Sequence, residues 1–327
     1  MARRLLRSRR SAPKGTRLFF CTDIHGSETC FRKFLNAGEF YDVDHLILGG
    51  DMTGKLLVPV TRTTGGYAAT FAEHRYVDLD RSGLAELTSL IRSKGAYTFV
   101  GTTAELEALT DDDERDRLFR KIVYDSVAEW VELAEARLRG TGRRCYIAPG
   151  NDDFVEIDDA LKGSSVVEFS EGRVLSLDDR HEMLTCGYAN PTPWNTEREL
   201  PEDSLRGAID KVAAEVQDFS NLVAVLHVPP FGSGLDDAPE LDDQLGMAMG
   251  AGGVHMTPVG STAVRGFIED QQPLMALHGH IHEGRGDVRI GRTLCINPGS
   301  EYTEGILDGA IAELGDGVIL RHQLVAG

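Results

Sequence analysis

The stretch from Leu274 to His282 has three histidines at alternate positions, directly after a short apolar run. An apolar run of this length predicts a buried strand, and its polar end then lies where the strand leaves the sheet. In open α/β sheets, ligands bind at that edge, beyond the carboxyl ends of the strands. Because imidazole is the commonest metal ligand among side chains, His280 and His282 are candidate ligands for one metal ion or for two adjacent ions.

Four other predicted strands end in the same way, with carboxylate, imidazole or amide side chains. The strands are predicted over Arg17–Thr22, Asp44–Leu48, Cys145–Ala148 and Asn221–Leu226. The polar residues that follow them are Asp23, His25, Asp51, Asn151 and His227. This donor set has no thiolate, so it suits Mn, Fe or Zn in a catalytic site better than it suits a structural zinc site.

Seven candidate ligands are too many for one ion and fit two. A carboxylate has two oxygens, so one aspartate can bridge two ions about 3.5–4 Å apart. Two such ions clamp the attacking and leaving oxygens of an in-line displacement at phosphorus, and they acidify a bridging water so that it attacks as hydroxide. The donor set therefore predicts two divalent or trivalent transition-metal ions and the hydrolysis of a phosphoester.

Strands and helices that alternate along the chain predict an α/β fold. A helix that begins after Ser27 joins the first two strands as a βαβ crossover. The chain between the second and third strands is far longer than the roughly 30 residues of such a unit, so we predict an insertion at about residues 52–100. In this part of the chain we predict short strands over Lys55–Thr63 and Tyr67–Leu79 and a long crossover helix over about residues 110–140.

Five blocks of the sequence resemble the calcineurin-like metallophosphoesterase family. They are Asp23-x-His25, Gly50-Asp51, Gly150-Asn151, His227 and Gly279-His280-x-His282, in the family's order, with one block at each strand end. The resemblance implies a four-layer α/β/β/α sandwich over residues 17–327, with the metal site at the carboxyl edge of the strands. It also implies the ligand roles: Asp23, His25 and His282 on one metal, Asn151, His227 and His280 on the other, and Asp51 bridging.

One block departs from the family pattern, at Asp152. Many members have a histidine after the Gly-Asn pair, where it protonates the leaving oxygen. An aspartate can act as this acid near pH 7 only if burial or a neighbouring carboxylate raises its pKa. Asp153 could supply that charge; alternatively, both aspartates are loop residues that cap the next helix. Asp152 and Asn151 are therefore the candidate catalytic residues.

Two residues later in the chain are candidate substrate contacts. Ser261 begins a predicted helix, and the free N–H groups of a helix N-terminus bind anions. Arg265, in the first turn of that helix, would add positive charge to a phosphate site. His255, in the glycine-rich loop before it, could also face the substrate. The alternatives are a solvated surface arginine and an ordinary loop histidine.

The chain has 327 residues and a net charge of −18. Residues 1–17 contain seven basic residues and no acidic one, so the rest of the chain is still more acidic. An acidic body argues against a duplex nucleic acid partner, because neutralising phosphates needs lysine and arginine. Residues 1–16 are predicted to be a disordered basic tail, since they lack the apolar run of a signal peptide.

No apolar run in the sequence reaches the length of a membrane span. The five cysteines show no paired spacing. Four of them, Cys21, Cys145, Cys186 and Cys295, lie in predicted strands, where cysteine behaves as a small apolar residue. These features indicate a reduced, cytoplasmic protein.

The sequence thus predicts a binuclear metal-dependent phosphoesterase that acts on a small phosphoester. A phosphodiester is the favoured substrate, because a missing general acid matters least when the leaving group departs readily. The alternatives are a phosphomonoesterase that acts on a nucleotide or a phosphoprotein, and a metal-bound interaction scaffold without turnover. All seven ligand positions are kept, which favours an enzyme over a scaffold.

Overall fold

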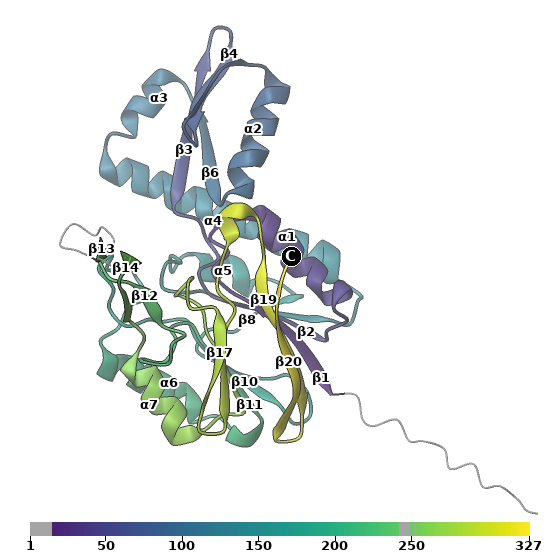
Figure 1. The fold of residues 1–327 in the computed structure, drawn as a ribbon. Helices are drawn as coiled ribbons and strands as arrows, with labels where there is room; N and C mark the ends of the chain where they lie inside the picture. The colour runs from purple at the N-terminus through teal and green to yellow at the C-terminus, as the bar shows by residue number, and fades with distance from the viewer. Residues whose placement is uncertain (1–14, 242–248, 251–252) are drawn as a thin grey trace, which may run out of the picture.

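The computed structural model describes residues 15–241, 249–250 and 253–327. Residues 1–14, which are most of the predicted basic tail, lie outside the described residues. Two six-stranded sheets form the main body, and a four-stranded sheet with its own helices stands apart from them (Figure 1). Within the described residues, no helix has both the length and the apolar character of a membrane span.

The first large sheet has the strand order β20-β19-β1-β2-β7-β8. Its strands are β1 (Thr16–Cys21), β2 (His45–Gly49), β7 (Arg144–Ala148), β8 (Val167–Phe169), β19 (Asp308–Gly315) and β20 (Val318–Ala326). Strands β1, β2, β7 and β8 are parallel, and the β19–β20 hairpin adds to β1 antiparallel. Because parallel strands share a direction, the loops after β1, β2 and β7 meet at one edge.

The second large sheet has the strand order β17-β18-β16-β11-β10-β9. Its strands are β9 (Val174–Ser176), β10 (Glu182–Cys186), β11 (Leu222–Leu226), β16 (Met275–Leu277), β17 (Gly286–Ile290) and β18 (Thr293–Asn297). The four central strands are parallel, and β9 and β17 are antiparallel edges. The loops after β11 and β16 therefore also share an edge.

Alternating side chains divide the core into layers. In β1, Phe19 and Cys21 pack against helices, whereas Leu18 and Phe20 pack against the second sheet. In β11, Val223 and its alternate neighbours pack toward the first sheet, and the others pack against helices. The helices over the first sheet are α1 (Glu28–Phe40), α4 (Asp112–Leu138) and α5 (Ile157–Lys162); those over the second are α6 (Glu202–Ala213) and α7 (Thr262–Gln271).

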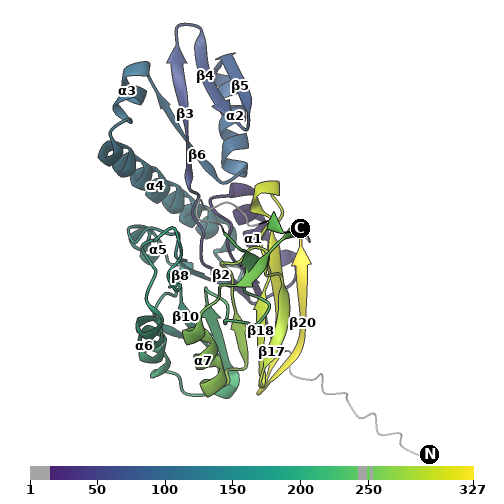
Figure 2. The same cartoon turned by 60° about the vertical axis from the view of Figure 1, so that its left-hand side comes forward.

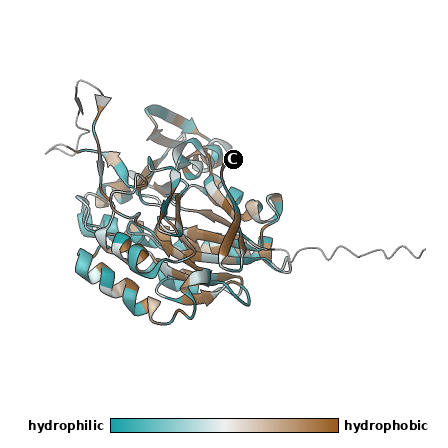
Figure 3. Cartoon of the chain, turned by 60° about the horizontal axis from the view of Figure 1, so that its bottom comes forward, coloured by the Kyte–Doolittle hydropathy of each residue, from teal (hydrophilic) through white to brown (hydrophobic). Residues whose placement is uncertain are grey.

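The layers are therefore helix, sheet, sheet and helix, and the predicted α/β class is confirmed. Figure 3 shows the apolar strands inside and the hydrophilic faces of the helices outside. The period of two along each strand explains this arrangement, because successive side chains point to opposite faces of a sheet.

The separate sheet has the order β5-β4-β3-β6 (Figure 2). It has its own apolar core. Its elements are β3 (Leu56–Thr63), β4 (Gly66–Phe71), β5 (His74–Leu79), β6 (Ala96–Gly101), α2 (Arg81–Ser93) and α3 (Thr103–Ala108). The prediction of one strand over residues 67–79 is wrong. Ala72 and Glu73 have φ of 47° and 64° and turn this segment into a hairpin. That the sheet is an insertion stays a prediction.

Short elements complete the described chain. Between β11 and α7 lie β12 (Asp237–Pro239), β13 (Met249–Gly250), β14 (Gly253–Val254) and β15 (Met256–Pro258). Two 3-10 turns, η1 (Phe219–Asn221) and η2 (Tyr302–Glu304), precede β11 and β19. The long crossover helix α4 is present, and Asp111 caps it by accepting from the N–H of Glu114.

Candidate metal centre

All seven predicted ligands lie in loops just beyond the carboxyl ends of strands. The first sheet contributes Asp23 and His25 after β1, Asp51 after β2 and Asn151 after β7; the second contributes His227 after β11, and His280 and His282 after β16. The first five in chain order are buried, and the last two are partly exposed. The site therefore forms only because the carboxyl edges of the two sheets lie together.

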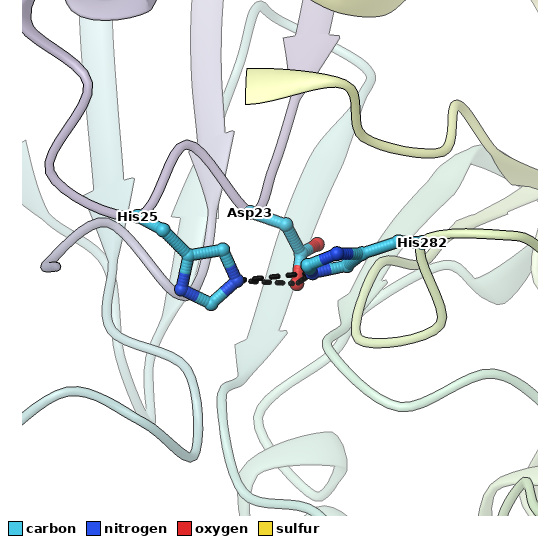
Figure 4. Close-up of side chains that lie close together, drawn as sticks. All are labelled: Asp23, His25 and His282. Carbon is cyan, nitrogen blue, oxygen red and sulfur yellow. Dashed lines mark hydrogen bonds and ion pairs between the residues drawn. The ribbon is translucent and has the colours of Figure 1, made fainter. Parts of the chain in front are cut away.

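Asp23, His25 and His282 form one group whose side chains converge (Figure 4). His25 Nε2 lies 3.8 Å from Asp23 Oδ1, and His282 Nε2 lies 3.5 Å from the same oxygen. The two Nε2 atoms are 3.0 Å apart. One carboxylate oxygen and two imidazole nitrogens at these positions could hold one ion.

Asp51, His227 and His280 form a second group, whose ligand atoms lie within 4.8 Å of one another. His227 Nε2 is 3.3 Å from Asp51 Oδ1. The other oxygen of Asp51, Oδ2, faces the first group and lies 3.9 Å from His25 Nε2. The two oxygens of Asp51 thus face different groups, which is the geometry that a bridging ligand needs.

Side chains of the candidate centre have buried polar atoms without a hydrogen-bond partner among the described residues. These atoms include Asn151 Oδ1 and His227 Nε2. A buried polar atom without a partner costs roughly 1–3 kcal/mol, and a metal ion can satisfy it. Carboxylate, imidazole and amide donors suit Mn, Fe or Zn. The residues present therefore fit the binding of metal ions.

Hydrogen bonds around the two groups orient the candidate ligands. His227 Nδ1 lies 3.1 Å from the carbonyl oxygen of Gly49, and donation from Nδ1 leaves Nε2 free to coordinate. The N–H of His280 donates to both carboxylate oxygens of Asp23, at 3.1 and 3.0 Å. Asn151 Nδ2 donates to Thr196 Oγ1 at 3.0 Å, which leaves Oδ1 as the free end of the amide.

Four of the seven candidate ligands have a left-handed backbone. The angle φ is 52° at Asp23, 38° at His25, 48° at Asp51 and 65° at His280. This conformation costs on the order of 1–3 kcal/mol at a non-glycine residue, so the surrounding structure must enforce it. The loops do so by bonding to each other, since the N–H of His25 donates to the carbonyl of Asp51 at 3.0 Å.

Glycines directly before two of the ligands let the loops approach each other. A Cβ at Gly150 would overlap the backbone nitrogen and the Oδ1 atom of Asp51. A Cβ at Gly279 would overlap Oδ2 of Asp23. The Gly-Asn and Gly-His pairs are therefore a steric requirement of the site.

Burial and crowded charge shift the pKa values in the cluster. Burial would lower the pKa of His227, but the carboxylates of Asp51 and Asp23 outweigh burial and raise this pKa to about 10. Burial raises the pKa of Asp51 to about 7. Burial lowers the pKa of His25 to about 3, so its imidazole is neutral at pH 7 and has a lone pair for a metal.

Asp152 is ionised in this environment. Its carboxylate pairs with the ammonium of Lys55 and lies 4.0 Å from His25 Nδ1. Burial would raise the pKa of Asp152, but the ammonium of Lys55 outweighs burial and lowers this pKa. A general acid near pH 7 needs the opposite shift, so the geometry does not favour that role for Asp152.

Asp153 is a structural residue that ties two loops together. Its carboxylate accepts from the N–H groups of Met52, Thr53 and Gly150 and from the Thr53 hydroxyl, at 2.6 to 3.1 Å. The side chain is fully buried, and these bonds join the loop after β2 to the loop after β7. Asp153 therefore has a structural role, and the pKa of Asp152 beside it is lowered because Lys55 outweighs burial.

Arg265 lies on helix α7, outside the seven-residue cluster. Its Nε donates to Glu269 Oε1 on the same helix, at 2.8 Å. The N-terminus of this helix already binds an anion, because Glu202 accepts from the N–H groups of Thr262 and Ala263 at 3.1 and 2.8 Å. Among the residues that the structure describes, Arg265 contacts none of the seven ligands, and its role toward substrate stays a prediction.

His255 lies between β14 and β15 and is exposed. Its Nδ1 is 3.8 Å from Glu240 Oε2, which makes an exposed surface pair. Within the described parts of the chain it contacts no candidate ligand, so its role as a substrate contact also stays a prediction.

A comparison with known sequences finds a relative that matches part of this chain. No family model matches the chain. The uncharacterized protein MJ1162 of Methanocaldococcus jannaschii is 30% identical over 152 residues, which are 46% of this chain and 61% of that protein. The chain therefore covers less than two thirds of this relative's length.

Solved structures match over nearly the whole chain. TT1561 of Thermus thermophilus aligns with a TM-score of 0.52 and 11% identity, over 96% of this chain and 98% of that one. A second solved structure aligns with a TM-score of 0.53 and 14% identity, over the same shares. YfcE, a phosphoesterase from E. coli, aligns with a TM-score of 0.33 and 10% identity, over 94% and 98% of the two chains. The chain shares its fold with TT1561 and with the second solved structure. Similarity at these identities concerns the fold alone.

Two polar residues at the edge of this candidate metal centre were not predicted. Thr196 accepts from Asn151, and Lys55 pairs with Asp152. Thr196 lies in the loop after β10, where no motif marks it. Lys55 follows shortly after Asp51, so its place beside a predicted ligand was a usable signal. Its contact with the loop after β7 is not visible in the sequence.

Proposed function

We propose that this chain is a binuclear metal-dependent phosphoesterase. The observation that carries the proposal is Asp51, whose two carboxylate oxygens face two separate groups of candidate ligands. Two bound transition-metal ions would supply Lewis acidity and an acidified water at phosphorus. The chain itself supplies the buried donors that hold such ions and the hydrogen bonds that orient those donors.

The proposed ligand roles follow the two groups. Asp23, His25 and His282 would hold one ion, Asn151, His227 and His280 would hold the other, and Asp51 would join both. The left-handed backbone and the bonds between loops hold these donors before any substrate arrives. Little reorganisation is then needed during the reaction, which is the main source of electrostatic catalysis.

We further propose that the preferred substrate is a phosphodiester. Asp152 is ionised and paired with Lys55, so it is not a carboxylic acid that could protonate a leaving oxygen. Lack of a proton donor matters least when the leaving group departs as a stable anion. A phosphomonoesterase that acts on a nucleotide or phosphoprotein, and a scaffold without turnover, are the other outcomes of the test.

A panel assay on protein reconstituted with Mn, Fe or Zn tests this function. The substrates are bis(p-nitrophenyl) phosphate, p-nitrophenyl phosphate, cyclic nucleotides and nucleoside phosphates. We expect metal-dependent turnover that is highest on a diester and that is lost in Asp51→Asn. Asp179→Asn removes an exposed carboxylate at the turn between β9 and β10 and should keep full activity. Two bound ions without turnover of any ester would support the scaffold instead.

A further inference from the structure

Lys55 is the first exposed residue after a buried segment, residues 52–54, of the loop that follows β2. The N–H groups of this segment donate to two buried side chains, Asp153 and Tyr97, at 2.8 to 3.1 Å. The backbone that carries Lys55 is therefore fixed relative to Asp51, the proposed bridging ligand.

The ammonium of Lys55 contacts Asp152 Oδ2. Asp152 is itself tied to the candidate centre: its N–H donates to Asp51 Oδ1 at 3.0 Å, and its carboxylate lies 4.0 Å from His25 Nδ1. The side chain of Asp152 is 9% exposed, whereas that of Lys55 is 62% exposed. The ammonium therefore borders both the candidate metal centre and solvent, where a ligand can reach it.

Lys55 also supplies positive charge where the centre has an excess of carboxylates. Asp23, Asp51 and Asp152 lie together there. In the described part of the chain, no other lysine or arginine forms an ion pair with these three carboxylates. Phosphoryl transfer places negative charge on the non-bridging oxygens, and a cation that faces them stabilises the transition state. Lysine commonly binds phosphate as a point charge.

We propose that Lys55, positioned by Asp152, binds a non-bridging oxygen of the substrate phosphate as a third cation of the site. The proposal rests on the proposed function, because it assigns a substrate contact to the same centre. Asp152 is then a positioning residue. It stands where the resembling family often has histidine, and Lys55 returns a positive charge to that position.

The competing explanation is that Lys55 only neutralises Asp152. A double-mutant cycle separates the two roles. Lys55→Met removes the ammonium and leaves Asp152 uncompensated beside the phosphate. Combining Lys55→Met with Asp152→Asn removes both charges. If Lys55 only neutralises Asp152, the double variant behaves like the wild type; if Lys55 binds phosphate, the double variant stays impaired.

The experiment measures the binding of inorganic phosphate to the Mn-loaded protein by calorimetry. It also measures kcat and KM on the ester that the wild type turns over. Lys55→Met should weaken phosphate binding and lower kcat/KM by roughly 10- to 100-fold, as expected for the loss of a hydrogen bond from a charged group. Elemental analysis should still find the wild-type metal content. Lys55→Arg keeps the charge and should retain more affinity than Lys55→Met.

Lys121→Met is the matched control. Lys121 is 68% exposed and pairs with Asp125 on the surface of α4, so this variant makes the same charge change away from the centre and should bind phosphate normally. Unchanged phosphate affinity in Lys55→Met, or full recovery in the double variant, would overturn the contact and leave the phosphoesterase proposal intact. A wild-type protein that binds phosphate through Lys55 but turns over no ester would support the contact and overturn the phosphoesterase proposal.

Discussion

At the scale of a single residue, three properties distinguish Asp51. It is 2% exposed, its backbone φ is 48°, and its two oxygens face two groups of imidazoles. Burial of a carboxylate is costly unless a cation or hydrogen bonds compensate it. The position of Asp51 is therefore the strongest sign that the edge of the sheets is built for metal ions.

Asp51→Asn should lower the occupancy of both ion positions. The substitution keeps the size of the side chain and removes the charge that both ions would share. Elemental analysis after reconstitution with Mn should find about two ions in the wild type, and fewer in the variant. Asp179→Asn should match the wild type. A wild-type protein that holds at most one ion would contradict the binuclear centre.

Metal binding should release protons, and metal affinity should rise with pH. The pKa of His227 is raised to about 10 by Asp51 and Asp23 against the effect of burial, so its imidazole carries a proton at pH 7. That proton must leave before Nε2 can coordinate, and each proton released makes binding about tenfold tighter per pH unit below that pKa. Calorimetry in buffers of different ionisation enthalpy counts the protons. Affinity that does not change between about pH 6 and 9 would argue against this account.

At the scale of elements, the loops after the strands act as one cross-linked unit. The N–H of Asp23 donates to the carbonyl of Gly50 at 3.0 Å, which joins the loop after β1 to the loop after β2. Asp153 joins the loop after β2 to the loop after β7. Because each loop supports its neighbour, displacement of one loop should disturb ligands on the others.

Gly150→Ala should test this coupling. Its new Cβ would overlap Asp51, which the cross-linked loops hold in place, so the carboxylate of Asp51 must move. We expect loss of metal binding and a lower Tm. Gly163→Ala, at the end of α5, is the control, because its φ is −83° and the new Cβ meets no atom within 4 Å. Normal metal content in Gly150→Ala would show that the loops are not coupled in this way.

At the scale of the whole molecule, the candidate centre belongs to both large sheets. The apolar layer between the sheets contains side chains from β1 and β2 on one side and from β11 and β16 on the other. That shared core sets the distance between the loops of the first sheet and the histidines of the second. Stability of the core and integrity of the centre are therefore linked.

We expect the cysteines to contribute packing to the core and to take no part in catalysis. All five are free and buried, and burial raises the pKa of Cys145 and Cys295 to about 12. Single Cys→Ala variants should lower the free energy of unfolding, on the order of 1 kcal/mol each, through lost packing. The specific activity of the folded protein should stay within a few-fold. Collapse of turnover in one well-folded variant would reveal a catalytic thiol.

Local pattern was sufficient to find the five strands that precede the candidate ligands, the α/β class and the seven candidate side chains. Apolar runs that end at Asp23 or His280 are visible in the sequence because strand length, side-chain alternation and donor chemistry are properties of a few adjacent residues. The hairpin of β4 and β5 was missed for a local reason too, since Ala72 and Glu73 are not residues that usually mark such a turn.

The grouping of the candidate ligands and the ionisation of Asp152 depend on contacts between segments that are far apart in the sequence. The two groups of ligands, and the oxygens of Asp51 that face them, depend on how the sheets pack against each other. The ionised state of Asp152 depends on Lys55, which reaches it from a different loop. Charges act through space, and burial depends on every layer around a side chain, so neither the sign of a pKa shift nor the partner of a carboxylate is encoded in its neighbours along the chain.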